Sequence, residues 1–329
     1  MYSEIPLYLA LIFTLAGLAL LAWSSDVFVD SASTVAKALG VSPFVIGMVI
    51  IGFGTSAPEF CVSVMSGVSG HSELSLGNAY GSCIFNVAVI IAIAALIKPI
   101  VVKPTVCYIA CPLLVLISLF SYVLLSDGFY SRADAISQLV VFALVLPAYC
   151  WIDQSNSVVK VNKRTHVYSR KRIMLSWFWL VVGLTVLILS SHFLVWGAVD
   201  LARTVGISEL VIGLTIIAVG TSLPELASAI ASARRGESEF VLGNIVGSNI
   251  FNILAIVGVA GSLAPIREFS EFVVKRDIFV MMALSLSLIF FGMNWKGFKK
   301  DGVINRYESI LFLIGYLLYT VFMLIQEAT

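Results

Sequence analysis

The sequence predicts an all-α polytopic membrane protein with ten transmembrane helices in two five-helix repeats of inverted topology. Three observations predict this fold. Hydrophobic residues make up 60% of the 329 residues and charged residues only 12%, which is more apolar surface than a soluble domain can bury. Apolar runs of about 20 residues, long enough to cross hydrocarbon as a helix, recur along the chain. Two polar motifs inside those runs each occur twice.

The apolar runs divide the chain into ten predicted spans. The first has no basic segment before it, so it is expected to be a span and not a cleaved signal peptide. The linker between the fifth and sixth runs is the only extended polar stretch. The ten runs lie near residues 5–30, 43–68, 75–97, 105–125, 133–152, 173–199, 209–233, 239–262, 277–294 and 308–326.

Lysine and arginine predict the orientation of these spans, because cytoplasmic loops are enriched in positive charge. The loops alternate between two sets, and one set holds all but five of the 20 basic residues. Assigning that set to the cytoplasm places both termini on the extracytoplasmic side of the cell membrane. The five basic residues of the other set are Arg132, Arg203, Arg267, Lys275 and Arg276.

The repeated motifs indicate a duplication. Gly52–Glu59, with the sequence GFGTSAPE, returns 166 positions later as Ala218–Glu225, AVGTSLPE. At the same offset Leu76–Asn86 returns as Leu242–Asn252, with eight of eleven residues identical. A membrane protein with two related halves usually binds its substrate where the halves meet. These motifs are therefore the place to look for function.

The duplication also predicts the domain organisation. We expect a first repeat at residues 1–152, a basic cytoplasmic linker at 153–172 and a second repeat at 173–329. Each half has an odd number of spans, so the second half crosses the membrane in the opposite sense. A further match joins Ser126–Ile136 to Lys300–Ile310 at an offset of 174.

Proline is expected to break the second and seventh helices inside the motifs. Pro58 has no amide hydrogen, so the carbonyl of Gly54 loses its normal helical partner, and Pro224 has the same effect on Gly220. In hydrocarbon a freed carbonyl needs another partner, and a bound cation can serve.

Oxygen-bearing side chains cluster around these breaks. Thr55, Ser56 and Glu59 are three and four residues apart, so they share one side of a helix. Ser82 and Asn86, four apart, form a second such face. Oxygen donors suit a hard cation such as Ca²⁺, whereas Zn²⁺ or Cu⁺ favours His and Cys. The second copy of the motifs supplies Thr221, Ser222, Glu225, Ser248 and Asn252.

The two glutamates favour exchange of ions. An acidic residue at the centre of a span costs about 2.5–3.5 kcal/mol on insertion scales, so a pair of them is expected to have a function in the protein. Two carboxylates balance one divalent ion or two monovalent ions. A competing interpretation is that Ser56-x-x-Glu59 and Ser222-x-x-Glu225 are capping boxes that begin a helix.

Other polar residues and glycines have structural interpretations. Asn78 and Asn244 are expected to form helix-to-helix hydrogen bonds. Asp26 and His192 occupy equivalent positions and could line an access route, act in a proton-linked step, or be satisfied by partners. The five cysteines are expected to be free thiols, so no cofactor is predicted. Close helix packing is predicted at Gly47, Gly77, Gly81, Gly213, Gly243 and Gly247.

At the two motifs the chain resembles the cation/Ca²⁺ antiporter superfamily, specifically the prokaryotic sodium/calcium exchangers. The family motifs are G-T-S-x-P-E followed by G-N-x-x-G-S-N-x-x-N/D. The resemblance implies alternating access, with sodium entry driving calcium out. It implies acidic ligands at Glu59 and Glu225, with Thr55, Ser56, Thr221, Ser222, Ser82, Asn86, Ser248 and Asn252 completing the site. It also implies sodium ligation by the backbone carbonyl of Ala218, and of Gly52.

The chain departs from the family pattern at two positions. Cys83 stands where the first G-S-N motif has asparagine, which weakens the packing role of that amide. Asn252 stands where some members, including potassium-dependent exchangers, have aspartate, and this argues against potassium co-transport. The short linker has no room for the regulatory calcium-binding domains of animal exchangers.

The leading functional hypothesis is therefore Na⁺/Ca²⁺ antiport, with Ca²⁺, Na⁺ and the lipid bilayer as the expected partners. Neither nucleic acid nor an obligate protein partner is expected. Antiport of H⁺ against Ca²⁺ or another cation is the alternative, because a glutamate can bind a proton in place of Na⁺. A cation channel and a membrane enzyme are the alternatives from other classes. The absence of HExxH and GxSxG motifs argues against the enzyme.

Overall fold

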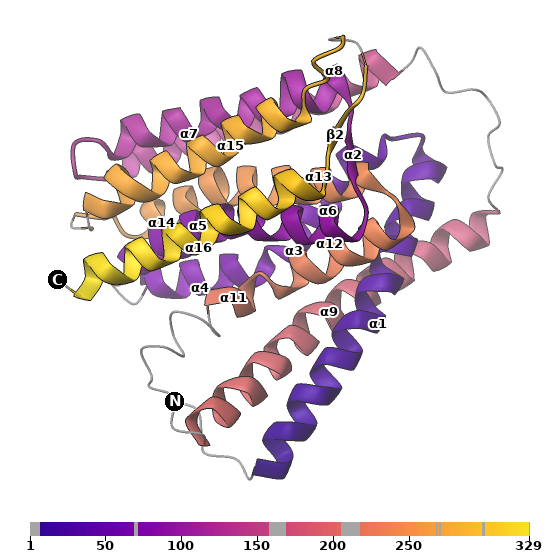
Figure 1. The fold of residues 1–329 in the computed structure, drawn as a ribbon, viewed down its shortest axis with the longest axis horizontal. Coiled ribbons are helices and arrows are strands. Elements are labelled where there is room, and N and C mark those ends of the chain that lie inside the picture. Colours follow the sequence, from indigo (N-terminus) through magenta and orange to yellow (C-terminus); the bar gives the residue numbers. More distant parts are fainter. Residues whose placement is uncertain are drawn as a thin grey trace.

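The computed structural model describes residues 7–68, 72–157, 169–204, 218–267, 269, 271–297 and 300–328. Within them the chain is almost wholly helical (Figure 1). Seven helices are long and apolar enough to cross a membrane, and eight if the bent pair Pro43–Thr55 and Ala57–Val64 counts as one span. The protein is therefore an all-helical, multi-pass membrane protein.

The two halves of the chain have similar element orders. The first half contains α1 (Leu7–Leu39), α2 (Pro43–Ile46), the π-helical η1 (Gly47–Gly52), α3 (Phe53–Thr55), α4 (Ala57–Val68), α5 (Ser72–Phe85), η2 (Asn86–Ile90), α6 (Ile91–Ile97), β1 (Ile100–Val102), η3 (Val106–Ala110), α7 (Cys111–Leu125) and α8 (Arg132–Ser157). The second half contains α9 (Arg170–Thr204), α11 (Ala218–Thr221), α12 (Leu223–Arg235), α13 (Ser238–Ile250), η5 (Phe251–Ile256), α14 (Val257–Leu263), η6 (Val273–Asp277), α15 (Ile278–Gly292), β2 (Gly302–Ile304) and α16 (Arg306–Ala328).

Eight of the ten predicted spans correspond to these seven helices and the bent pair. The predicted span 209–233 lies partly outside the described residues, as does Gly213, and its described part is α11 and α12. The predicted span 277–294 corresponds to α15, which has 15 residues and continues from the charged helix η6. The helix of the first span is longer than predicted and ends at Leu39.

Both ends of the predicted linker, residues 153–172, are helical. Helix α8 continues to Ser157 and α9 begins at Arg170. Both helices extend past the apolar runs because residues on either side of the linker are compatible with helix and contain neither Gly nor Pro. Residues 158–168 of the linker lie outside the described part of the chain.

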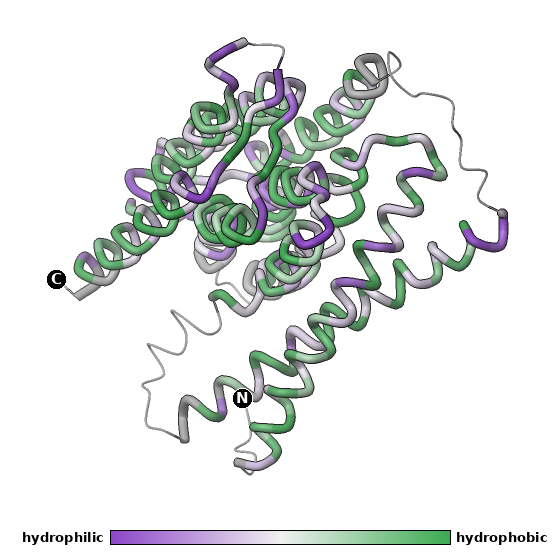
Figure 2. Tube along the Cα trace, turned by 45° about the vertical axis from the view of Figure 1, so that its right-hand side comes forward, coloured by the Kyte–Doolittle hydropathy of each residue, from purple (hydrophilic) through white to green (hydrophobic). Residues whose placement is uncertain are grey.

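Helices α1 and α9 form a long pair that lies beside the rest of the bundle (Figures 1 and 2). Two glycines allow their close approach. A Cβ added to Gly17 would lie 2.8 Å from the backbone nitrogen of Leu194, and one added to Gly183 would lie 3.0 Å from that of Phe28. The two contacts are equivalent, because Gly183 and Leu194 stand 166 positions after Gly17 and Phe28.

Two short backbone pairings were missed by the expectation of an all-α chain. β1 pairs antiparallel with β2, with Ile100 opposite Ile304, and an isolated bridge joins Tyr130 to Ile266. The two pairings are also equivalent: Ile266 follows Ile100 by 166 positions, and Ile304 follows Tyr130 by 174. Extended residues next to span ends leave backbone groups unpaired, and these pairings satisfy them.

Most residues along the long helices are hydrophobic, and hydrophilic residues are frequent in the loops that join them (Figure 2). Large side chains of the outer helices, such as Leu15, Leu144 and Leu317, are more than half exposed, as lipid-facing residues must be. Helix α13 is almost wholly buried, and α5 packs on α4 and η5. Both repeated motifs therefore lie in the interior of the protein.

Candidate cation site

Both motif helices break at a serine. Between α3 and α4 Ser56 has φ −80° and ψ 10°, and between α11 and α12 Ser222 has φ −90° and ψ 10°. The first break bends the span by 44°. Proline occupies the second position of each following helix, where its missing amide hydrogen costs no helical bond. Glu59 and Glu225 then fall in the first turn of α4 and α12, where the helix dipole favours a carboxylate.

Each of these serines donates a hydrogen bond to the glutamate of the other half. The Ser56 Oγ–Glu225 Oε1 distance is 2.7 Å, and the Ser222 Oγ–Glu59 Oε1 distance is 2.9 Å. Both glutamates are almost completely buried. The two carboxylates, 166 residues apart in sequence, thus belong to one buried cluster in the interior of the bundle.

The capping-box interpretation is wrong for Ser222, whose side chain forms no cap hydrogen bond. The hydroxyl instead donates to Glu59 Oε1, and the Oγ of Ser82 lies 3.3 Å from Ser222 Oγ. A serine hydroxyl has one proton to donate. Its donation to a carboxylate of the other half favours a role in the cluster over local capping.

The threonines and Ser248 complete the wall of the cluster. Thr221 lies beside Glu59, and Thr55 and Ser248 lie beside Glu225. The Thr55 hydroxyl is 3.0 Å from the carbonyl oxygen of Ile51, and Ser248 Oγ is 3.0 Å from that of Gly52. A threonine or serine that donates to a carbonyl keeps its lone pairs free for another partner.

Several buried oxygen atoms in the cluster have no hydrogen-bond partner among the described residues. They are Glu59 Oε2, Glu225 Oε2 and the side-chain oxygens of Asn86 and Asn252. An unsatisfied buried polar group costs about 1–3 kcal/mol, and more if charged. The described ion pairs, which join α1 to α12, α13 to the β1 loop and residues of η6, do not involve either glutamate. A cation would satisfy these oxygens.

Of the predicted site residues, the structure brings together Thr55, Ser56, Glu59, Ser82, Thr221, Ser222, Glu225 and Ser248. Two buried amides adjoin them: Asn86, which donates to Asn249, and Asn252, which lies beside Cys83. Ala218 is the first residue of α11, three residues before Thr221. The Gly52 carbonyl accepts from Ser248 Oγ and from the Ser56 amide at 3.2 Å. The cluster therefore contains two carboxylates, two amides and hydroxyls from both halves.

Comparison with known proteins identifies the family. The model of the sodium/calcium exchanger protein family matches residues 9–150 and 175–325. The chain belongs to this family. The protein CaxA of Alkalimonas amylolytica is 40% identical over 314 residues, covering 94% of this chain and 97% of its own. The inner membrane protein YrbG of Escherichia coli is 34% identical, covering 94% and 95%.

A solved structure of the sodium-calcium exchanger NCX_Mj, soaked with 10 mM Na⁺ and zero Ca²⁺, superposes on this exchanger with a TM-score of 0.82. The two are 30% identical, and the match covers 95% of this chain and 98% of that chain. The protein is thus a cation/Ca²⁺ exchanger of the antiporter type, a transporter and not an enzyme.

Two asparagines of the exchanger hold the glutamate backbones, as the sequence predicted for helix-to-helix hydrogen bonds. Asn78 Nδ2 lies 3.1 Å from the carbonyl oxygen of Glu59, and Asn244 Nδ2 lies 3.2 Å from that of Glu225. Each amide also donates to a serine hydroxyl of the same glutamate helix. These bonds fix the helix that follows each break.

Sequence reasoning missed Asn249. Its side-chain nitrogen, Nδ2, donates to the backbone carbonyl of Cys83 at 3.3 Å, and its side-chain oxygen accepts from Asn86 Nδ2 at 3.0 Å. The available signal was the substitution of Cys83 for asparagine at the equivalent position. That difference marks a contact between the two halves.

The glycines of α13 pack closely on the first motif helix. A Cβ on Gly247 would lie 2.2 Å from the Met48 carbonyl oxygen, and one on Gly243 would lie 2.3 Å from that of Phe44. The predicted packing role is correct for these two and for Gly47. The segment equivalent to η1 in the second half lies outside the described residues, so Gly77 and Gly81 are not tested.

Asp26 and His192 lie outside the buried cluster. Both are exposed, on α1 and α9. Arg235 of α12 donates to the Asp26 carbonyl at 3.0 Å and pairs with Asp30 at 2.6 Å. The Asp26 position thus supports the partner-satisfied interpretation.

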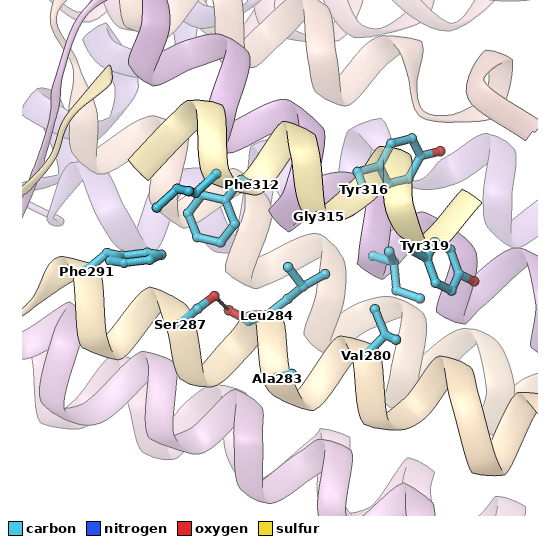
Figure 3. Close-up of a pocket in the computed structure, with 11 residues that line it drawn as sticks. Val280, Ala283, Leu284, Ser287, Phe291, Phe312, Gly315, Tyr316 and Tyr319 are labelled. Atoms are coloured by element: carbon cyan, nitrogen blue, oxygen red, sulfur yellow. Dashed lines mark hydrogen bonds between the residues drawn. The ribbon is translucent and has the colours of Figure 1, made fainter. Parts of the chain in front are cut away.

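A cavity between α15 and α16 measures about 350 Å³ (Figure 3). Figure 3 shows Val280, Leu284 and Phe291 of α15 facing Phe312 and Tyr316 of α16. Its walls are almost entirely apolar, so it lacks the oxygen atoms that bind a hard cation.

Proposed function

We propose that the protein is a Na⁺/Ca²⁺ antiporter that works by alternating access and binds its ions between Glu59 and Glu225. The partnerless carboxylate and amide oxygens of the buried cluster carry this proposal. Ca²⁺ takes six to eight oxygen ligands, carboxylates among them. The cluster supplies oxygens of this kind from both halves of the chain.

The charge of the cluster accounts for exchange. Two carboxylates without a described basic partner are neutralised by one Ca²⁺ or by two Na⁺. The loaded site is then nearly neutral in either form, whereas the unloaded site keeps two buried charges. Because burying an unpaired charge is strongly unfavourable, the unloaded protein resists the change of access that the loaded protein makes. Ion movement is thereby coupled.

The proposed ligands are the two glutamates and the polar side chains around them. Glu59 and Glu225 supply charge, and Asn86 and Asn252 supply amide oxygens. Further oxygen ligands are the backbone carbonyls of Ala218 and Gly52, for sodium, and the hydroxyls of Thr55, Ser56, Ser82, Thr221, Ser222 and Ser248.

The proposed architecture is ten spans in two inverted repeats, residues 1–152 and 173–329, joined by a cytoplasmic linker at 153–172. Equivalent contacts at the same sequence offset support it, among them the reciprocal serine–glutamate bonds. So does the family model, which matches two segments. The proposed location is the cell's inner membrane, with both termini extracytoplasmic.

Transport in proteoliposomes tests the function. Vesicles loaded with Na⁺ and diluted into Na⁺-free buffer should accumulate ⁴⁵Ca²⁺, and vesicles without the Na⁺ gradient should not. Glu59→Gln and Glu225→Gln each remove one of two buried charges, worth about 3 kcal/mol, so uptake should fall on the order of 100-fold.

Glu271→Gln is the matched control, because Glu271 is exposed and its one ion pair among the described residues is with Lys275; its uptake should equal that of the unmutated protein. A pH gradient in place of the Na⁺ gradient distinguishes the H⁺-coupled alternative. Uptake driven by the pH gradient alone would mean that H⁺, and not Na⁺, is the coupling ion. Uptake that survives both glutamate substitutions would disprove the proposed site.

A further inference from the structure

Cys83 and Asn249 are equivalent residues, 166 positions apart, and they contact each other. The side-chain nitrogen Nδ2 of Asn249 donates to the backbone carbonyl of Cys83 at 3.3 Å. In the reverse direction the Cys83 thiol lies 3.8 Å from the Asn249 carbonyl oxygen. A residue can touch its own equivalent only near the axis that relates the two halves. Position 83 therefore lies at the centre of the repeat contact.

One of the contacts around this axis has no counterpart. Asn86 Nδ2 donates to Asn249 Oδ1 at 3.0 Å. The equivalent bond would run from Asn252 Nδ2 to a side-chain oxygen at position 83, and Cys83 has none. The Asn252 side chain interacts instead with the Cys83 sulfur, which is a weak acceptor, and neither of its polar atoms has an oxygen or nitrogen partner among the described residues although the side chain is fully buried.

The two amides therefore differ in how firmly they are held. Asn86 is held through its nitrogen, so only its oxygen is left for the cluster. Asn252 has only the weak sulfur acceptor of Cys83 to distinguish its nitrogen from its oxygen. An amide turned by half a rotation presents N–H groups, which repel a cation. The ion must then hold the Asn252 side chain with its oxygen toward the site, and this ordering costs part of the binding free energy.

We propose that Cys83 is a positioning residue that lowers the cation affinity of the site, because its sulfur restrains the Asn252 amide only weakly. It acts through Asn252 and makes the two halves of the site unequal. This inference rests on the proposed function only where it concerns ion affinity. The missing hydrogen bond itself can be tested without any ion.

Cys83→Asn tests the inference. The buried Asn249 indicates that an asparagine fits the equivalent position. The new side-chain oxygen should accept from Asn252, which raises the thermal unfolding temperature in ion-free detergent buffer. Because the bond is also present without the ion, ion binding gains only from the fixed orientation of the amide, and the apparent KM for Ca²⁺ should fall about twofold. In an Asn252→Ala background both gains should vanish, as a double-mutant cycle requires.

Asn249→Cys is the matched reverse variant, and it keeps the inference testable if Cys83→Asn does not fold. It removes the bond that holds the Asn86 amide in one orientation, so the apparent KM for Ca²⁺ should rise about twofold. That rise in KM should shrink in an Asn86→Ala background, because the amide that Asn249 holds is then absent.

Three outcomes decide the matter. An unchanged unfolding temperature and KM in Cys83→Asn overturns the inference. A gain that persists in the Asn252→Ala background also overturns it, because the effect would then not pass through Asn252. If the unmutated protein moves no Ca²⁺ but Cys83→Asn is still stabilised through Asn252, the missing hydrogen bond is supported and the proposed function fails.

Discussion

At the scale of single residues, the reciprocal bonds Ser56–Glu225 and Ser222–Glu59 link the two halves of the exchanger. Each hydroxyl donates to a buried carboxylate oxygen and leaves the other oxygen, Oε2, without a described partner. Hydrogen bonds to a charged group contribute more than neutral ones, about 1.5–3 kcal/mol. The serines thus orient the carboxylates and keep one oxygen of each free for an ion.

Removal of either serine hydroxyl should weaken ion binding. Ser56→Ala and Ser222→Ala each leave one glutamate oxygen without its donor, so the apparent affinity for Ca²⁺ should fall by about 10-fold in each, in line with a charged hydrogen bond. Because the two bonds are equivalent, the losses should be similar. Dose–response curves of ⁴⁵Ca²⁺ uptake measure them.

Ser118→Ala is the control for this pair of variants. Ser118 is also fully buried, but its hydroxyl donates only to the Leu114 carbonyl of its own helix at 2.8 Å. Its loss should leave the Ca²⁺ affinity unchanged. An equal loss of affinity in all three variants would mean that the serines act through general packing.

At the scale of the elements, the site depends on how closely α13 approaches the first motif helix. Gly247 and Gly243 lie against backbone atoms of Met48 and Phe44, so no side chain can fit between the two helices. Small residues at helix contacts are the usual means of close approach in membranes. This contact brings Ser248 within hydrogen-bond distance of Gly52.

Gly247→Ala should therefore destabilise the fold. The added methyl group would meet backbone, which cannot move aside as a side chain can, so a loss of about 1–3 kcal/mol is expected. Gly315→Ala in α16 is the control, since no described atom lies within 4 Å of its added Cβ and alanine favours helix by about 1 kcal/mol. Thermal unfolding in detergent should fall for the first and hold or rise for the second.

At the scale of the whole molecule, the two backbone pairings are consistent with the orientation that the basic residues predict. β1 and β2 join two loops of the lysine- and arginine-rich set, and the Tyr130–Ile266 bridge joins two loops of the other set. Loops that pair through backbone hydrogen bonds must lie on the same side of the membrane. The alternation of the loops therefore agrees with their contacts.

Cysteine labelling tests which side is which. Asp127→Cys, in the loop before Tyr130, should react with a membrane-impermeant maleimide in intact cells, whereas Lys300→Cys, next to β2, should react only after permeabilisation. The reference is the labelling of the unmutated protein, which has five cysteines of its own. The reverse pattern would invert the proposed topology.

The sequence alone determined much of this protein. Composition required a membrane, because 60% hydrophobic residues have no other solvent. Eight of the ten span positions were predicted because a span is a local property of about 20 consecutive residues. The duplication singled out Glu59 and Glu225, because a charge repeated inside apolar runs has few structural explanations. Helix ends were less accurate and the short strand pairs were missed, since neighbouring segments determine them.

Only the tertiary structure decided which residues meet. Helical spacing places Ser56 near Glu59 of its own helix, yet its hydroxyl is bonded to Glu225. Nothing local in the sequence assigns Asn249 to Asn86 or places Asn252 beside the sulfur of Cys83. Such contacts join residues more than 160 positions apart, and they depend on the crossing of helices that close glycine contacts permit. A one-dimensional pattern can name the chemical groups of a site, but the packing of the two halves selects their partners.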